Sequence, residues 1–284
     1  MPPPITVREM TAEDIPAGMR LKTLAGWNQV EADWRLFLDA SPGGCFVTTD
    51  DQQVIGTVTT MSYGTRFGTR LGWIGMLLVD PDHRRKGIGT RLMRRAMQHL
   101  EACTTMGLDA TPLGRPLYER LGFRPVADLQ RMVLDSAPPP GAPQHGIVPL
   151  GQPADWALDR RAFGADRQDL LGALQARTPA LAWQRTHSDR MQGYCLGRRG
   201  TTYTQIGPLV AKQVEDAVAL CQAALRACAG EPVLLDVPLS KERFRRHLAE
   251  LGFVDRRAFT RMVVGADPPG TFARQFVIAG PEFG

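Results

Sequence analysis

The spacing of apolar residues divides the first half of this chain into short strands and amphipathic helices. Alternating or continuous apolar runs predict strands at residues 5–7, 45–49, 54–63 and 71–79, and helical spacing predicts helices from residue 15 and over residues 30–38. Because the three strands from 45 to 79 follow one another directly, an antiparallel meander is favoured.

The pattern then changes to a helix, a strand and a short helix. Ile88, Leu92, Ala96 and Leu100 recur every four residues, which predicts a helix with one apolar face. A strand at 107–110, a short helix at 117–121 that ends at Gly122, and a strand at 129–134 follow. We therefore expect an α+β fold with a mixed sheet, largely antiparallel and flanked by helices.

Short segments of the first half recur in order in the second half. Leu121-Gly122-Phe123 returns as Leu251-Gly252-Phe253, and Arg131-Met132-Val133 returns as Arg261-Met262-Val263, both after 130 residues. Trp73-Ile74-Gly75 and Leu108-Asp109 have similar counterparts in Gln205-Ile206-Gly207 and Leu235-Asp236. Four matches in the same order indicate two copies of one fold.

Proline marks the boundary between the two copies. Residues 137–144 contain four prolines, which remove backbone donors and fix φ, so this segment is expected to be a linker. We predict one domain over residues 1–136, a second over 145–266, and a C-terminal tail over 267–284. The tail is apolar enough at residues 276–281 to dock on the body of the protein.

The residues Arg84-Arg85-Lys86-Gly87-Ile88-Gly89 lie between a predicted strand and a predicted helix. The first backbone N–H groups of a helix lack intrahelical partners and carry the positive end of the helix dipole, which favours a phosphate. Gly87 and Gly89 allow close approach of the backbone, and the basic residues add charge. An ordinary solvated basic turn is the alternative interpretation.

Composition and charge narrow the classes of partner, compartment and metal that are expected for this protein. The formal net charge is +5 and the basic residues are spread along the chain, so a nucleic-acid partner is not expected. The first residues do not resemble a signal peptide, and no apolar run reaches the roughly 20 residues that span a bilayer, so we expect a cytoplasmic protein without a membrane partner. The five cysteines have no zinc-ligand spacing, and no metal is expected.

The meander, the R-x-x-G-x-G loop on a helix, the next strand and the segment 117–123 together resemble the GNAT superfamily of acyl-CoA-dependent N-acetyltransferases. The resemblance covers about residues 5–134. It implies a sheet that is splayed between its fourth and fifth strands, with acetyl-CoA in the cleft. The second half resembles the degenerate copy of a tandem acetyltransferase, since Glu215 and Asp216 lie where the first half has its basic loop, and Leu248 lies opposite Tyr118.

The resemblance also implies roles for individual residues. Tyr118 lies where the family places its general acid, and Thr111 lies where it often has a cofactor-binding asparagine. Leu78 and Val79 would pair with the pantetheine arm, and the pyrophosphate would be held by Arg84, Arg85, Lys86, Gly87, Ile88, Gly89 and Thr90. The acceptor side of the cleft would be formed by Trp27, Asn28 and Trp34, although closing the core is an equal alternative for the two tryptophans.

The general base has no evident candidate in the sequence. Relatives often carry a glutamate on the fourth strand, but residues 71–79 contain neither an acid nor a histidine. Asp109 and His83 are the nearest alternatives, and a water chain or an already neutral amine would also serve. We expect an N-acetyltransferase that acts on a small-molecule or peptide primary amine in a ternary complex; the alternative is a non-enzymatic acyl-CoA sensor or interaction module. The sequence leaves a homodimer open.

Overall fold

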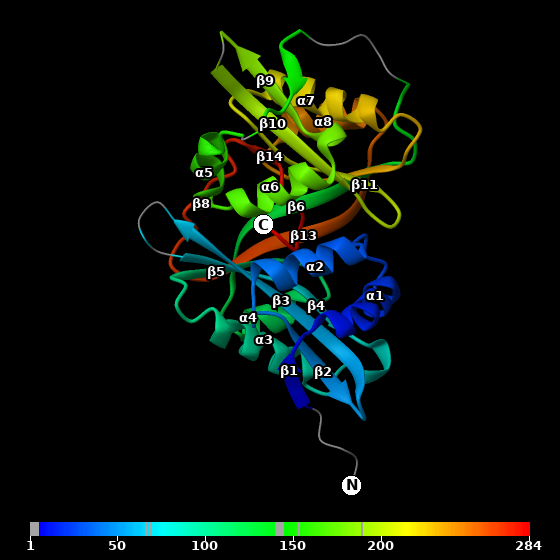
Figure 1. Cartoon of the computed structure of the whole chain (residues 1–284), viewed down its shortest axis with the longest axis vertical. Helices are drawn as coiled ribbons and strands as arrows, with labels where there is room; N and C mark the ends of the chain where they lie inside the picture. Colours follow the sequence, from blue (N-terminus) through cyan, green and yellow to red (C-terminus); the bar gives the residue numbers. More distant parts are fainter. Residues whose placement is uncertain (1–5, 66–67, 69, 140–144, 153, 189) are drawn as a thin grey trace.

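The first half of the chain folds in the order that the apolar pattern predicts (Figure 1). The computed structural model describes residues 6–65, 68, 70–139, 145–152, 154–188 and 190–284. The elements of this half are β1 (Thr6–Glu9), α1 (Ile15–Leu24), α2 (Glu31–Ala40), β2 (Phe46–Asp50), β3 (Gln53–Thr65), β4 (Arg70–Val79), α3 (Ile88–His99), β5 (Thr105–Ala110), α4 (Arg115–Arg120) and β6 (Arg124–Leu134). The predicted elements are confirmed, with β6 beginning five residues earlier than expected. Ile5, the first residue of the predicted opening strand, lies outside the described residues.

The second half repeats the same order of elements with additions at its start and end. Its elements are β7 (Ile147–Pro149), α5 (Ala157–Phe163), β8 (Ala165–Asp166), α6 (Gln168–Arg177), β9 (Trp183–His187), β10 (Arg190–Arg199), β11 (Thr204–Ala211), α7 (Val214–Ala227), β12 (Val233–Pro238), α8 (Glu242–Glu250), β13 (Val254–Gly265) and β14 (Gln275–Val277). Short 3-10 turns lie at Ala12–Asp14, Pro81–His83 and Pro179–Leu181. Of the predicted linker, residues 140–144 lie outside the described residues.

Local sequence signals explain where several helices begin and end. Before α1, the backbone N–H of Thr11 donates to the Asp14 carboxylate at 2.9 Å, as in a helix cap. Gly122 follows α4 with φ of 88°, a left-handed conformation that glycine adopts without strain. The apolar stripe of α3 is buried, with Ile88 and Leu92 at most 1% exposed. This stripe packs the helix on β2, β3 and β4.

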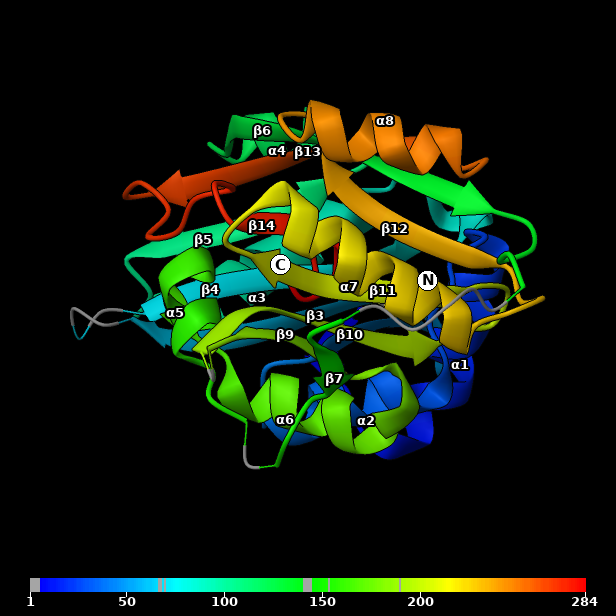
Figure 2. The ribbon, with the colours of Figure 1, turned by 90° about the horizontal axis from the view of Figure 1, so that it is seen from above.

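Both halves contribute to one sheet. Within the described residues, fourteen strands are joined, and twelve of them follow the order β1-β2-β3-β4-β5-β13-β6-β12-β11-β10-β9-β7. Figure 2 shows helices on both faces of this sheet, with α2 and α6 side by side on one face and α8 on the other. Helix α3 covers the strands of the first half and α7 covers β9, β10 and β11 of the second.

The two halves exchange their final strands. Strand β13 of the second half lies between β5 and β6, and β6 of the first half lies between β13 and β12. Every pairing in this central part is antiparallel, with Arg261 of β13 opposite Asp109 of β5 and Arg131 of β6 opposite Asp236 of β12. The repeated tripeptides therefore occupy equivalent places. The domain boundaries at residues 136 and 145 stay a prediction, because the last strand of each half lies among strands of the other.

Two equivalent ion pairs join the exchanged strands. Arg131 donates from Nε and Nη2 to the two carboxylate oxygens of Asp236, both at 2.8 Å. Arg261 makes the same two contacts, also at 2.8 Å, with Asp109. Both aspartate side chains have no exposed surface. Because a buried charge is costly unless it is paired and hydrogen-bonded, each half requires an arginine of the other.

Removal of one partner of such a pair is expected to destabilise the whole protein. Asp236→Ala leaves the Arg131 guanidinium buried and unpaired, so the free energy of unfolding should fall by about 3–5 kcal/mol. Urea denaturation followed by circular dichroism measures this loss. As a matched control, Glu215→Ala removes the exposed partner of Arg243 and should cost less than about 1 kcal/mol. Equal losses in the two variants would contradict the role of the buried pair.

Candidate functional site

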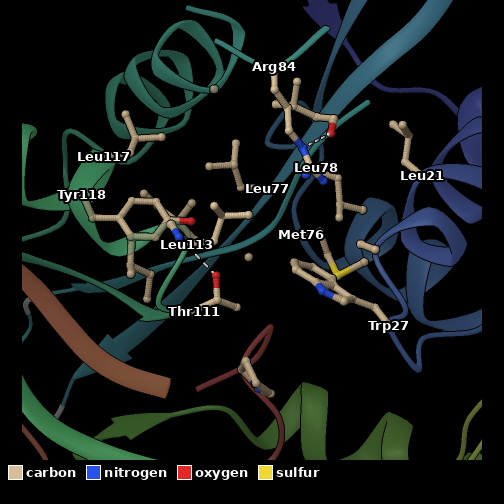
Figure 3. A pocket seen from close by; sticks show the side chains of 18 of the residues that line it. Leu21, Trp27, Met76, Leu77, Leu78, Arg84, Thr111, Leu113, Leu117 and Tyr118 are labelled. Atoms are coloured by element: carbon tan, nitrogen blue, oxygen red, sulfur yellow. Dashed lines mark hydrogen bonds between the residues drawn. The ribbon is translucent and has the colours of Figure 1, made fainter. Parts of the chain in front are cut away.

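A large cavity opens in the first half where β4 and β5 separate. These parallel strands are paired only from Leu71 to Trp73, opposite Thr105 to Gly107. Beyond Trp73 the strands diverge, and residues 74–79 of β4 and Leu108 of β5 line a cavity of about 880 Å³. The separation confirms the predicted splay of the sheet. Figure 3 shows Met76, Leu77 and Leu78 between Tyr118 on one side and Trp27 on the other.

A bulge in β4 turns this strand toward the cavity. Thr57 of β3 pairs with Leu78, but Thr59 pairs with Gly75, so β4 carries an extra residue here. Met76 takes up the irregularity with φ of 48°, and its carbonyl accepts a hydrogen bond from the Thr57 hydroxyl at 2.8 Å. Bulges re-aim the strand beside them. Within the described residues, no strand pairs with β4 on the cavity side after Trp73, so this edge is available to a ligand.

The glycine loop forms another wall of the cavity. Gly87 precedes α3 with φ of 77°, and a side chain there would meet no atom within 4 Å. The first intrahelical bond runs from Arg91 N–H to the Gly87 carbonyl, which leaves the amides of the first turn for a ligand. The cavity lining includes every residue of the predicted group from Arg84 to Thr90 except Lys86, whose side chain is exposed. Leu78, Val79 and Thr111 also line the cavity.

Tyr118 lies on the opposite wall, in α4. Its ring packs edge-on against Phe123, with 6.2 Å between ring centroids, and a Cβ on Gly114 would lie 2.9 Å from it. Only 9% of the residue is exposed, and this burial raises the pKa of the phenol well above its ordinary value. The hydroxyl is therefore protonated at neutral pH. Nearby, the Thr111 hydroxyl accepts a hydrogen bond from the Gly114 amide at 3.2 Å. This bond holds the turn that precedes α4.

The three residues predicted for the acceptor side are separated in the structure. Trp27 lines the cavity together with Leu21 and Leu24 of α1, which makes this wall apolar. Asn28 does not line it, because its amide binds the backbone of Thr202 and Tyr203 in the second half. Trp34 is 0% exposed and packs on Gly18, so it closes the core rather than the cleft.

Residues of the exchanged strands and of the second half also line this cavity, and the sequence did not indicate which residues these would be. The exchanged strands bring Arg131 of β6 and Arg257 and Phe259 of β13 to its lining, and Pro281 and Glu282 of the tail join them. Arg257 is half-buried, and burial together with the charge of Arg131 lowers the pKa of its guanidinium. The repeated tripeptide around Arg131 was the signal in the sequence that could have indicated this arrangement. It did not show which strands would pair with one another.

The two residues considered as general bases, Asp109 and His83, both have charged partners on the protein. Asp109 is held at both oxygens by Arg261, while burial raises its pKa. His83 lies 3.5 Å from the carboxylate of Asp50 and 3.7 Å from that of Asp80. It lines the cavity together with Arg84. Asp109 is therefore fully paired on the protein, whereas the buried Nδ1 of His83 makes no hydrogen bond within the described residues.

The equivalent cleft of the second half is filled by the chain itself. Strands β11 and β12 pair only at Thr204 and Gln205 and then separate, as β4 and β5 do. Strand β14 enters the gap and pairs with β11, and the Ile278 amide donates to the Asp236 carbonyl at 3.1 Å. The helix that follows, α7, carries Glu215 and Asp216 in its first turn. Leu248, the counterpart of Tyr118, is fully buried.

Metal ligands and membrane-spanning helices are the remaining features to be considered in the described residues. Among the described residues, no group of three or more His, Cys, Asp or Glu side chains is placed to hold a metal ion. In the same part of the chain, no helix is long and apolar enough to cross a bilayer. The five cysteines are all free thiols, and four of them are buried.

Comparison with known proteins relates both halves to one family. A family model described as "Acetyltransferase (GNAT) domain" matches residues 41–125, and a second model with the same description matches residues 156–276. The chain is 28% identical over 247 residues to YitH of Bacillus subtilis, described as an uncharacterized N-acetyltransferase, with 85% of each chain covered. It is 24% identical over 261 residues to holothin acyltransferase of a Pseudoalteromonas species, covering 91% of this chain and 87% of that relative.

A solved structure from Pyrococcus horikoshii, described as a "putative acetyltransferase", shares the fold over almost the whole chain. Its TM-score is 0.83 at 22% identity, and the match covers 99% of this chain and 96% of that one. Fold, cleft and comparisons together define an acyl-transferring enzyme. The chain belongs to the GNAT family of acetyltransferases and carries two GNAT domains in tandem.

Proposed function

We propose that this protein transfers an acetyl group from acetyl-CoA to a primary amine by direct attack in a ternary complex in the first-half cleft. One observation carries the proposal: a single cavity is lined by the free edge of β4, the glycine start of α3 and the Tyr118 ring. These are the parts needed to hold a pantetheine arm, a pyrophosphate and a departing sulfur. Among the described residues, the second half carries no equivalent set, because β14 fills its cleft.

The shape and charge of the cavity fit acetyl-CoA. The open space at Gly87 admits a pyrophosphate to the amides at the start of α3, and Arg84 and Arg85 add positive charge. The unpaired edge of β4 at Leu78 and Val79 offers backbone groups to the amides of an extended pantetheine arm. Acetyl-CoA would supply the activated acyl carbon. The chain's own residues would bind and orient acetyl-CoA and the amine, and would move protons.

Positioning is the larger part of the expected rate enhancement. An alkylamine has a pKa near 10.4, so neutralising it at pH 7 costs about 4–5 kcal/mol. Holding an amine and a thioester in attack geometry supplies up to about 7–11 kcal/mol. Tyr118 contributes a proton for the leaving sulfur, because burial keeps its phenol protonated. The apolar wall at Leu21, Leu24 and Trp27 favours an amine with an apolar body.

The most direct test of this function is consumption of acetyl-CoA in the presence of amino acids, polyamines, aminoglycosides and peptide N-termini. Acetylation of at least one of these amines, with release of free CoA, is the expected result. Calorimetric binding of CoA without acetylation of any amine would instead favour an acyl-CoA sensor or interaction module.

Loss of the Tyr118 hydroxyl should slow turnover without weakening CoA binding. Tyr118→Phe keeps the ring against Phe123 and removes the donated proton, so kcat should fall by about 100-fold while the Kd for CoA stays the same. Steady-state kinetics and calorimetry measure the two quantities. Tyr203→Phe, which removes a hydroxyl outside the cavity, is the control and should have normal kcat. A normal kcat in the Tyr118 variant would exclude Tyr118 as the acid.

A negative side chain at the start of α3 should prevent CoA binding. Gly87→Glu places a carboxylate beside the expected pyrophosphate, and like charges in contact cost several kcal/mol, so the Kd should rise by about 100-fold or more. The control is Gly230→Glu, at a glycine with φ of 78° and the same open space in the second half. Calorimetry should show unchanged affinity there. Equal losses in both variants would point to backbone strain instead.

A further inference from the structure

The C-terminal segment passes from the cleft of the second half into that of the first. After β14, its carbonyl groups accept hydrogen bonds from first-half side chains: Trp73 Nε1 donates to Pro281 at 2.9 Å, and the Tyr63 hydroxyl donates to Phe283 at 3.1 Å. Arg167 Nη1 donates to the Gly284 carbonyl at 2.8 Å. The ring of Phe283 stacks on Phe37, with centroids 4.9 Å apart. The segment is thus fixed at the inner end of the cavity.

Two equivalent glycines make room for this segment. A Cβ on Gly207 of β11 would lie 2.2 Å from the Ile278 carbonyl oxygen. A Cβ on Gly75 of β4 would lie 2.9 Å from the Glu282 carbonyl oxygen. These are the glycines that recur in the two copies of the sequence. At Gly75, the backbone of Glu282 therefore covers the strand on which the family resemblance implied an acid, and no side chain fits there.

Glu282 lines the cavity, and one oxygen of its carboxylate has no hydrogen-bond donor among the described residues. The residue is 3% exposed, and its Oε1 accepts from Arg198. Its Oε2 is buried and has no hydrogen-bond partner among the described residues. Gln29, whose amide lies beside this carboxylate, also lines the cavity, and its Oε1 likewise lacks a partner there. Two cavity-lining residues therefore each carry a buried acceptor oxygen that lacks a donor, and buried acceptors are normally hydrogen-bonded.

The charged residues around Glu282 do not supply the missing hydrogen-bond donor. Arg198 is shared, since it also contacts Asp33 at 3.5 Å and donates to the Gln205 side chain and the Ala279 carbonyl. Burial raises the pKa of Glu282, and the positive charge of Arg198 opposes that rise.

We propose that Glu282, with the Gln29 amide oxygen, receives the ammonium group of the acceptor and that Glu282 is the general base of the reaction. An ammonium supplies three N–H donors, which is enough to donate to both unpartnered oxygens. The inference rests on the proposed acetyl transfer and names the base that β4 does not carry. It makes the C-terminal segment part of the catalytic machinery.

The proton transfers balance as follows. The ammonium gives one proton to the Glu282 carboxylate, and the neutral nitrogen forms a bond to the acyl carbon. The carbon–sulfur bond breaks, and the sulfur takes the proton of the Tyr118 hydroxyl. The remaining excess proton on nitrogen returns to the phenolate through water, and Glu282 releases its proton to solvent. One amide, one free CoA thiol and one proton result.

The test compares two classes of acceptor with Glu282→Gln. For an alkylamine, which must lose a proton, kcat/KM should fall by about 100-fold or more, the usual contribution of a general base. For an aromatic amine, which is already neutral at pH 7, the rate should stay near that of the wild type. Calorimetry should show unchanged CoA affinity, and thermal melting checks that the variant is folded.

Asp33→Asn is the matched control. Asp33 belongs to the same charge network and its side chain is 1% exposed, but it does not line the cavity. This variant removes a negative charge that raises the pKa of Glu282, so it should change the ratio of alkylamine to aromatic-amine rates far less than Glu282→Gln does. Gln29→Leu should raise KM for the alkylamine severalfold with a smaller effect on kcat.

Three outcomes would count against the proposal. Wild-type rates for the alkylamine in Glu282→Gln would overturn it while leaving acetyl transfer intact. An equal fall for both amine classes would assign Glu282 a structural role only. If the wild-type protein acetylates no amine of either class, the proposed function itself fails, and the inference falls with it.

Discussion

The pairing of buried aspartates in one half with arginines of the other is the constraint on which this structure depends. Asp109 and Asp236 lie on the fifth strand of each copy with no exposed side-chain surface, and each is satisfied at both oxygens by an arginine on the exchanged strand. Because an unpaired buried charge costs several kcal/mol, neither copy can complete its sheet alone. The tandem arrangement is therefore a single body with one continuous sheet, in which the first half carries the open cleft.

The C-terminal segment fills the cleft of the second half and also reaches the cleft of the first. The splayed strands of the second half hold β14, and the residues after β14 continue across the shared sheet to the inner end of the first cleft. Arg257 and Phe259 reach the same cavity from β13. A copy that has lost the glycine loop and the phenol thus supplies a wall of the site and, in our proposal, the carboxylate that accepts the acceptor's proton.

Local patterns in the sequence predicted the elements and the glycine loop, because each depends on residues that are close in sequence. The recurring short segments predicted the repeat. The exchange was not predictable, since apolar spacing defines a strand but not its partner, and β6 and β13 present the same tripeptide. Asn28 and Trp34 lie within seven residues of Trp27 in sequence, yet Trp34 closes the core and Asn28 binds the second half. Glu282 is 207 residues from Gly75, and only the folded path of the tail brings them together.

Differential scanning calorimetry of the full chain, with and without CoA, tests most directly whether the two halves form one functional body. With one sheet and reciprocal ion pairs, we expect a single transition whose calorimetric and van't Hoff enthalpies agree. CoA at about 100 times its Kd should stabilise that transition as a whole, by about 2.7 kcal/mol. Two separate transitions, of which CoA shifts only one, would contradict the dependence of the cleft on both halves.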